Sequence, residues 1–87
     1  MEPLITELNR ILPVVTRVHS DHHPELREVL TQYEKLTEAV NANDNNAVKE
    51  RIEKIAEITN QFTIPEDACP TYTKAYQALH NIYTLCK

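Results

Sequence analysis

The stretch that decides the fold is VHSDHHPELREVL, residues 18–30, because one helix ends in it and the next helix begins. Pro24 disfavours helical backbone at His23. It suits the first position of a helix, where its missing N–H would have no partner anyway. Glu25 then lies in the first turn, where the positive end of the helix dipole favours an acidic side chain. We therefore expect a turn at residues 20–23 between two helices.

Apolar residues recur at three- and four-residue steps on both sides of this turn. The stripe before the turn consists of Leu4, Leu8, Ile11, Val15 and Val18. Because its phase continues across Pro13, it predicts one helix over residues 3–20, kinked at Pro13. After the turn, a stripe from Leu26 to Val40 predicts a second helix over residues 24–40.

The second half of the chain predicts two more helices. The Asn-rich residues 41–46 form a polar turn in which asparagine tolerates left-handed backbone, and Asp44 or Asn45 caps the next helix. The apolar stripe that follows predicts a helix over residues 45–62. Glu66-Asp67 then offers an acidic cap for a last helix, over residues 67–86. Four helices joined by short turns predict an all-α, small antiparallel four-helix bundle, a single domain over residues 1–87.

The composition excludes several classes of function. Nine Lys and Arg against 13 Asp and Glu give a net charge of -4, which argues against nucleic-acid binding. No apolar run approaches the roughly 20 residues of a membrane helix, and the N-terminus does not resemble a signal peptide, so we expect a cytoplasmic protein without membrane contact. The absence of glycine excludes the phosphate-binding loops and nucleophile elbows that need it. Because no set of acid, base and nucleophile can be named, we do not expect an enzyme.

The two cysteines are expected to be free thiols. Cys69 and Cys86 lie in the same predicted helix, about 25 Å apart, so they cannot form a disulfide within one chain. Cys69 falls in the first turn, where the helix dipole favours a thiolate and acidic Glu66 and Asp67 oppose it. It is either a reactive thiol or an ordinary small buried or capping residue.

The histidines before Pro24 are candidate metal ligands. His19 extends the stripe of the first helix and therefore points inward, whereas His22 has ligand spacing from it only if the helix continues that far. Asp21 would supply an oxygen, and imidazole with carboxylate suits iron or zinc. The alternative is that these are solvated histidines at a helix C-terminus, where they interact favourably with the dipole.

Two segments resemble the hemerythrin-like iron–sulfur cluster repair family. VVTRVHSDHHPELREVL, residues 14–30, resembles V-x-R-V-H-G-x-x-H-P-E-L-x-x-V, and FTIPEDACPTYTKAYQAL, residues 62–79, is similar to P-x-x-A-C-x-T-Y-x-x-x-Y-x-x-L. The two occur in the family's order and cover somewhat under half of the chain. The resemblance implies a four-helix bundle and a role in restoring iron–sulfur clusters after oxidative or nitrosative stress. In the family, histidines and carboxylates hold a non-haem di-iron centre. The matching positions here are His19, His23, Pro65, Ala68, Cys69, Thr71, Tyr72 and Tyr76, of which His19 is the candidate metal residue.

Two ligand-bearing segments of that family, H-M-x-K-E-E and H-x-x-L-E-N-N, are not in this sequence. The resemblance therefore implies a short divergent member without a complete di-iron site. Such a protein would act in iron or stress-related cluster maintenance by binding a protein partner or weakly held iron. Two alternatives stay open. One is a homodimer that shares an iron or zinc site around His19 and His22, and the other is a metal-independent protein-interaction module.

Overall fold

The computed structural model describes residues 1–86, and four α helices account for most of them. They are α1 (Glu2–His19), α2 (Glu25–Asn41), α3 (Asn45–Ile58) and α4 (Pro70–Leu85). The described residues contain no strand. Among them, no helix is both long enough and apolar enough to span a membrane. The predicted all-α class and four-helix bundle are confirmed.

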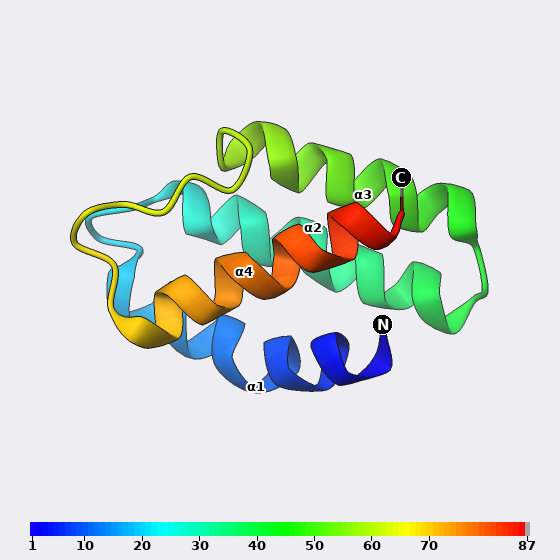
Figure 1. Ribbon diagram of the computed structural model, residues 1–87, viewed down its shortest axis with the longest axis horizontal. Helices are drawn as coiled ribbons and strands as arrows, with labels where there is room; N and C mark the ends of the chain where they lie inside the picture. The colour runs from blue at the N-terminus through cyan, green and yellow to red at the C-terminus, as the bar shows by residue number, and fades with distance from the viewer. Residues whose placement is uncertain (87) are drawn as a thin grey trace.

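Each helix packs against two others, in the cyclic order α1, α2, α3, α4 and back to α1. Figure 1 shows that the chain reverses direction at each connection. The α1–α2 turn and the α3–α4 loop therefore lie at one end of the molecule, and the α2–α3 turn lies at the other. This topology brings the C-terminus of α1 beside the N-terminus of α4, although the two are far apart in the sequence.

The core consists of aliphatic and tyrosine side chains from all four helices. Its largest fully buried members are Tyr72, Tyr76, Leu8, Leu12, Leu26, Leu36, Ile52, Ile55, Leu79, Ile82, Val15 and Val29. The stripe predicted for α1 is wrong at Val18, which is 60% exposed. The interior face of α1 runs through Ile5, Leu8, Leu12 and Val15, and the next position at this spacing is His19.

The bounds of α1 and α2 and the start of α3 agree closely with the predicted ones. α1 continues as one helix through Pro13. Asn43 takes the left-handed backbone expected in the Asn-rich turn, with φ 57°. Asp44 caps α3, and its Oδ1 accepts a hydrogen bond of 3.1 Å from the backbone N–H of Ala47.

The predicted end of α3 at residue 62 is wrong, because the helix ends at Ile58. Asn60, Gln61 and Phe62 have φ of 53°, 60° and 61°, so the chain turns in the left-handed region. The Thr59 hydroxyl accepts a hydrogen bond from the N–H of Phe62 at 2.9 Å. Phe62 is nevertheless buried, and its ring stacks on His80 at 5.1 Å between centroids. Because Phe62 is buried, the apolar periodicity of the sequence continues past the last residue of the helix.

The predicted start of α4 at residue 67, with Glu66-Asp67 as the cap, is also wrong. α4 begins at Pro70, and Cys69 is its N-cap, with φ -76° and ψ 167°. The physical reason is Pro70, which suits the first helical position and disfavours helical backbone at the residue before it. Cys69 therefore lies just before the first turn of α4, whereas the sequence predicted that it lies within that turn.

Candidate functional site

The candidate site lies where α1 ends and α4 begins. His19 is the last residue of α1, and Cys69 is the N-cap of α4. The Nε2 atom of His19 lies 3.3 Å from the Sγ atom of Cys69, across 50 residues of sequence. Both side chains are half-buried. At this distance the imidazole and the thiol form a hydrogen bond, and the tautomer of the imidazole decides which of the two atoms is the donor.

Cys69 has a second hydrogen-bond partner in the backbone of its own helix. The N–H of Tyr72 donates to Sγ at 3.4 Å, as an N-cap side chain requires. Sγ therefore faces an imidazole nitrogen on one side and a backbone N–H at the positive end of α4 on the other. Both groups stabilise negative charge on sulfur when the imidazole is protonated.

A small hollow of about 110 Å³ opens beside this pair. Its lining consists of Val14, Val15, Val18, His19, Cys69 and Thr71. Val14 and Val18 lie one turn apart on α1 and are 42% and 60% exposed. The thiol and the imidazole are thus approached from solvent along a mainly apolar wall.

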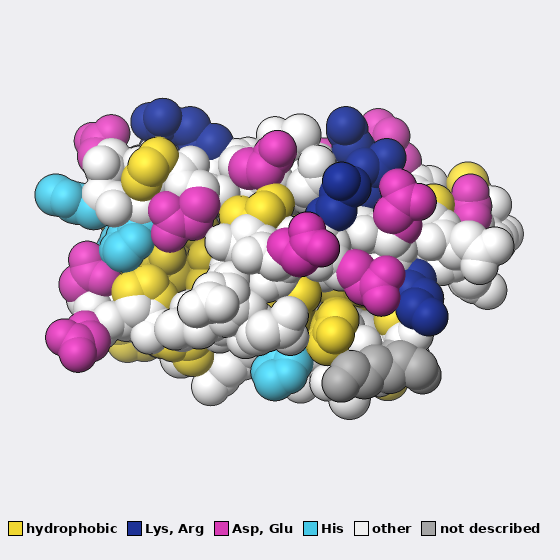
Figure 2. All heavy atoms as spheres, turned by 90° about the horizontal axis from the view of Figure 1, so that it is seen from above, with side chains coloured by type: hydrophobic (Ala, Val, Ile, Leu, Met, Phe, Trp, Pro, Cys, Tyr) yellow, Lys and Arg dark blue, Asp and Glu magenta, His cyan; other side chains and the backbone are white. Residues whose placement is uncertain are grey.

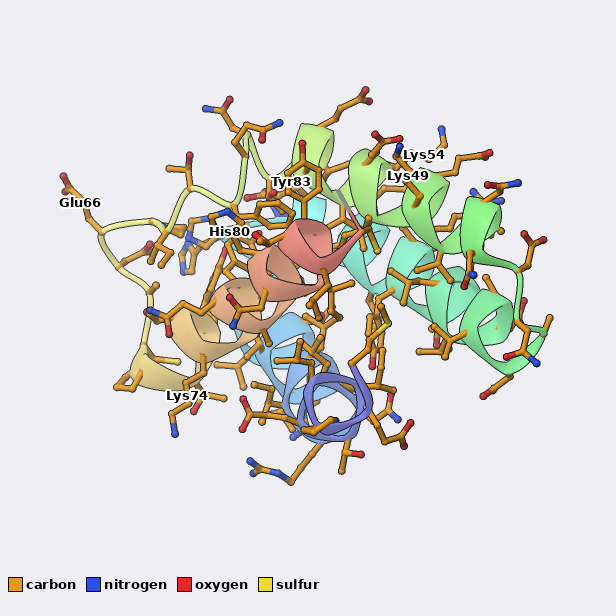
Figure 3. All side chains as sticks on the ribbon, turned by 45° about the vertical axis from the view of Figure 1, so that its right-hand side comes forward. Lys49, Lys54, Glu66, Lys74, His80 and Tyr83 are labelled. Carbon is orange, nitrogen blue, oxygen red and sulfur yellow. The ribbon has the colours of Figure 1, made fainter. Side chains whose placement is uncertain are left out.

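A second polar group adjoins the pair. His23 Nε2 lies 3.0 and 3.1 Å from the two carboxylate oxygens of Asp67, and His23 Nδ1 lies 3.5 Å from Glu25 Oε2. The hydrogen bond from His23 holds the pKa of Asp67 below its ordinary value. Figure 2 shows histidine and acidic side chains together at the end of the molecule that carries the α1–α2 turn. Glu66, by contrast, points away from the loop in Figure 3.

Tyr72 lies between the two groups. Its ring meets the rings of His19 and His23 edge-on, with centroids 5.1 and 5.6 Å away, and that of Tyr76 at 5.0 Å. Its side chain is fully buried, and the hydroxyl has no hydrogen-bond partner. Burial raises the pKa of Tyr72, and it also raises the pKa of Tyr76. The ring of Tyr72 thus contacts the rings of both histidines.

The residues proposed from the sequence are only partly brought together. His19 meets Cys69, whereas His22 is exposed in the turn after α1. Asp21 lies 3.9 Å from Arg27 instead. Within residues 1–86, no group of three or more His, Cys, Asp or Glu is placed to hold a metal ion. Cys86 is a second free thiol at the far end of α4.

Sequence reasoning did not identify the His19–Cys69 contact or the His23–Asp67 pair. The available signal was topological. In an antiparallel four-helix bundle with short turns, the end of the first helix and the start of the fourth lie at the same end. Each of the two segments that resemble the repair family reaches this end.

Comparison with known proteins identifies no match to this chain, either among protein-family models or among solved structures.

Proposed function

We propose that this protein is a small helical binding protein of iron–sulfur cluster maintenance, which holds iron weakly through His19 and Cys69. The observation that carries the proposal is the 3.3 Å contact between these two side chains. Each comes from one of the two segments that resemble the repair family. In the fold the two segments meet at His19 and Cys69, which are two of the positions that match the family pattern.

The separation of the two atoms suits a pair of ligands on one ion. In a tetrahedral site with metal–nitrogen and metal–sulfur distances near 2.0 and 2.3 Å, the two ligand atoms are about 3.5 Å apart. His19 Nε2 and Cys69 Sγ need only a small movement to reach that separation. Imidazole and thiolate both bind iron as well as zinc. Two protein ligands leave the other coordination positions open, which favours weak binding and transfer to a partner.

The di-iron centre of the family that the sequence resembles does not fit this chain. Among residues 1–86, the buried side chains include no histidine and no carboxylate, and the buried polar ones are Thr16, Ser20, Gln32 and Thr59. The bundle interior, where hemerythrin-like proteins hold iron, is filled by leucine, isoleucine and tyrosine. The proposed function is therefore binding at the end of the bundle.

The test is an anaerobic titration with Fe²⁺ of the wild type and of four single variants. Cys69→Ser and His19→Ala are expected to weaken binding at least about tenfold each, since each removes one of two ligands. Serine keeps the helix cap, so the first variant isolates the loss of sulfur. Cys86→Ser and His22→Ala are the matched controls and should bind like the wild type. Unchanged binding in the first two variants, or two irons per chain with an oxo-bridged absorption spectrum, would contradict the proposal.

A second candidate function is a metal site shared by two chains. It is favoured by the exposure of His22, which lies three residues after the half-buried His19 at the same end of the bundle. A symmetric dimer through this end would bring together two His19–Cys69 pairs, with His22 within reach of the partner. It predicts that iron or zinc converts a monomer into a dimer in light scattering, and that His22→Ala weakens this conversion. If the affinity for a protein partner is the same with and without metal and in every histidine variant, the protein is instead a metal-independent interaction module.

A further inference from the structure

We infer that Cys69 is a site of thiol–disulfide exchange with small neutral or cationic disulfides, with His19 as its proton acceptor. This inference goes beyond iron binding, because it concerns the metal-free protein and a different reaction of the thiol. It predicts a covalent modification site at the end of the bundle.

The first argument is the surroundings of the sulfur. The thiolate is the nucleophile in disulfide exchange, so a reactive cysteine needs a group that accepts its proton and groups that stabilise the anion. His19 Nε2 at 3.3 Å supplies the first, and the N–H of Tyr72 at 3.4 Å adds a donor for the second. The edge-on ring of Tyr72 keeps the imidazole in place.

The second argument is a comparison within the same chain. Cys86 is also free and half-buried, but it lies after the last helical residue of α4. It therefore meets the negative end of a helix dipole, which disfavours a thiolate. Burial raises the pKa of the Cys86 thiol further. The two cysteines thus differ in the features that control reactivity, although their exposure is similar.

The third argument concerns the co-reactant. The hollow beside Cys69 measures about 110 Å³ and is walled by Val14, Val15 and Val18, so it accommodates a short aliphatic group. The carboxylates of Asp67 and Glu25 both contact His23, whose ring meets the same Tyr72 ring as that of His19. With a net charge of -4, the protein repels anions as a whole. These features favour a small neutral or cationic disulfide over an anionic one such as glutathione disulfide.

The reaction needs no further oxidant. The proton of the Cys69 thiol moves to Nε2 of His19, and the thiolate attacks one sulfur of the disulfide. A new S–S bond forms to Cys69 as the original S–S bond breaks. The departing thiolate takes the proton from the imidazolium, so one thiol and one disulfide give one mixed disulfide and one thiol.

The experiment measures the modification rates of both cysteines in the full chain after treatment with EDTA. The protein is mixed with cystamine, 2-hydroxyethyl disulfide or glutathione disulfide at pH 7, and peptide mass spectrometry follows Cys69 and Cys86 separately. Cys69 is expected to react with cystamine about tenfold faster than Cys86. Cystamine and the neutral disulfide should modify Cys69 faster than glutathione disulfide. His19→Phe, which retains an aromatic ring against Tyr72, should slow Cys69 about tenfold and leave Cys86 unchanged.

Equal rates at the two cysteines of the wild type would overturn the inference without any variant. Faster modification by glutathione disulfide would overturn the co-reactant class, and an unchanged Cys69 rate in His19→Phe would overturn the role of the imidazole. If His19→Phe loosens the bundle, the modification rate of Cys86 rises as well. His19→Gln then serves as the variant that lacks the imidazole. Because EDTA removes metal, a failure of iron binding leaves these rates unaffected, and the two proposals fail separately.

Discussion

Two buried tyrosines show how one hydroxyl group decides the effect of a substitution. The Tyr33 hydroxyl lies 2.7 Å from Asn9 Oδ1 and 3.1 Å from the carbonyl oxygen of Ile5, and burial raises the pKa of Tyr33 to about 12. The Tyr72 hydroxyl is buried without a partner. A buried polar group costs free energy unless it is hydrogen-bonded. The two side chains therefore respond differently to the loss of the hydroxyl.

We predict that Tyr33→Phe lowers the free energy of unfolding by about 1 kcal/mol, because it removes a satisfied hydrogen bond. Tyr72→Phe should leave it unchanged or raise it by up to about 1 kcal/mol, because it removes an unsatisfied group. Urea unfolding of the two variants beside the wild type measures both effects. A loss in Tyr72→Phe as large as that in Tyr33→Phe would contradict the prediction.

At the scale of single residues, the sequence predicted that His19 faces inward but did not predict which residue it contacts. The apolar stripe of α1 predicted correctly that the His19 side chain points toward the other helices. Its contact with Cys69 crosses 50 residues, and periodicity within a helix contains no information on such contacts. The cap was misassigned for a similar reason, because it depends on a contact across 44 residues. Aspartate is the commoner cap, and Asp67 was available three positions before Pro70, yet Asp67 pairs with His23 instead.

The helix boundaries that the sequence missed are those around the α3–α4 loop. Apolar periodicity continues to Phe62, so the pattern alone predicts a helix to that point. The helix ends earlier because three successive residues after Thr59 adopt left-handed backbone without glycine. Such backbone is unusual for a bulky residue, and burial of the Phe62 ring helps to maintain it.

This loop provides a prediction on backbone strain. Left-handed backbone costs a non-glycine residue roughly 1–2 kcal/mol, part of which glycine loses again through its greater freedom in the unfolded chain. Gln61→Gly should therefore raise the free energy of unfolding by about 0.5–1 kcal/mol. Gln77→Gly, on the exposed side of α4, is the control and should lower it by about 1 kcal/mol. Equal losses in the two variants would show that residue 61 is not strained.

The start of α4 provides a second prediction for an element. Cys69 Sγ accepts the hydrogen bond that a serine or aspartate oxygen usually accepts at this position. Cys69→Ser should therefore preserve stability, whereas Cys69→Ala should lower the free energy of unfolding by about 1 kcal/mol. Thermal unfolding of the two variants by circular dichroism measures the difference. Identical melting curves would show that the sulfur does not cap the helix.

For the whole molecule, the sequence predicted the architecture better than the boundaries. Four amphipathic stripes and short turns suffice to predict an antiparallel bundle, since each helix has one apolar face to bury. The same topology implies that residues near the α1–α2 turn meet residues before α4. The location of the site was thus predictable from the fold class, whereas its partners required the three-dimensional structure.

The His23–Asp67 pair ties the α1–α2 turn to the loop before α4, so it closes one end of the bundle. Asp67 has a lowered pKa in the folded protein, and the first cause is the hydrogen bond from His23. The folded state therefore binds a proton at Asp67 less readily than the unfolded chain does. The resulting stabilisation is present above the ordinary pKa of 3.8 and is lost as the pH falls through the lowered value.

We predict that Asp67→Asn lowers the free energy of unfolding at pH 6, and that the difference from the wild type shrinks as the medium is acidified below the ordinary pKa of aspartate. Urea midpoints along an acidic pH series test this. Glu66→Gln is the matched control, because it removes the same charge from the adjacent residue, which is exposed and points away from the loop. Its effect should be small at every pH. A gap between Asp67→Asn and the wild type that stays constant in acid would show that His23 does not control the titration of Asp67. The α1–α2 turn and the loop before α4 would then be held together by the His19–Cys69 contact and by the apolar contacts between α1 and α4.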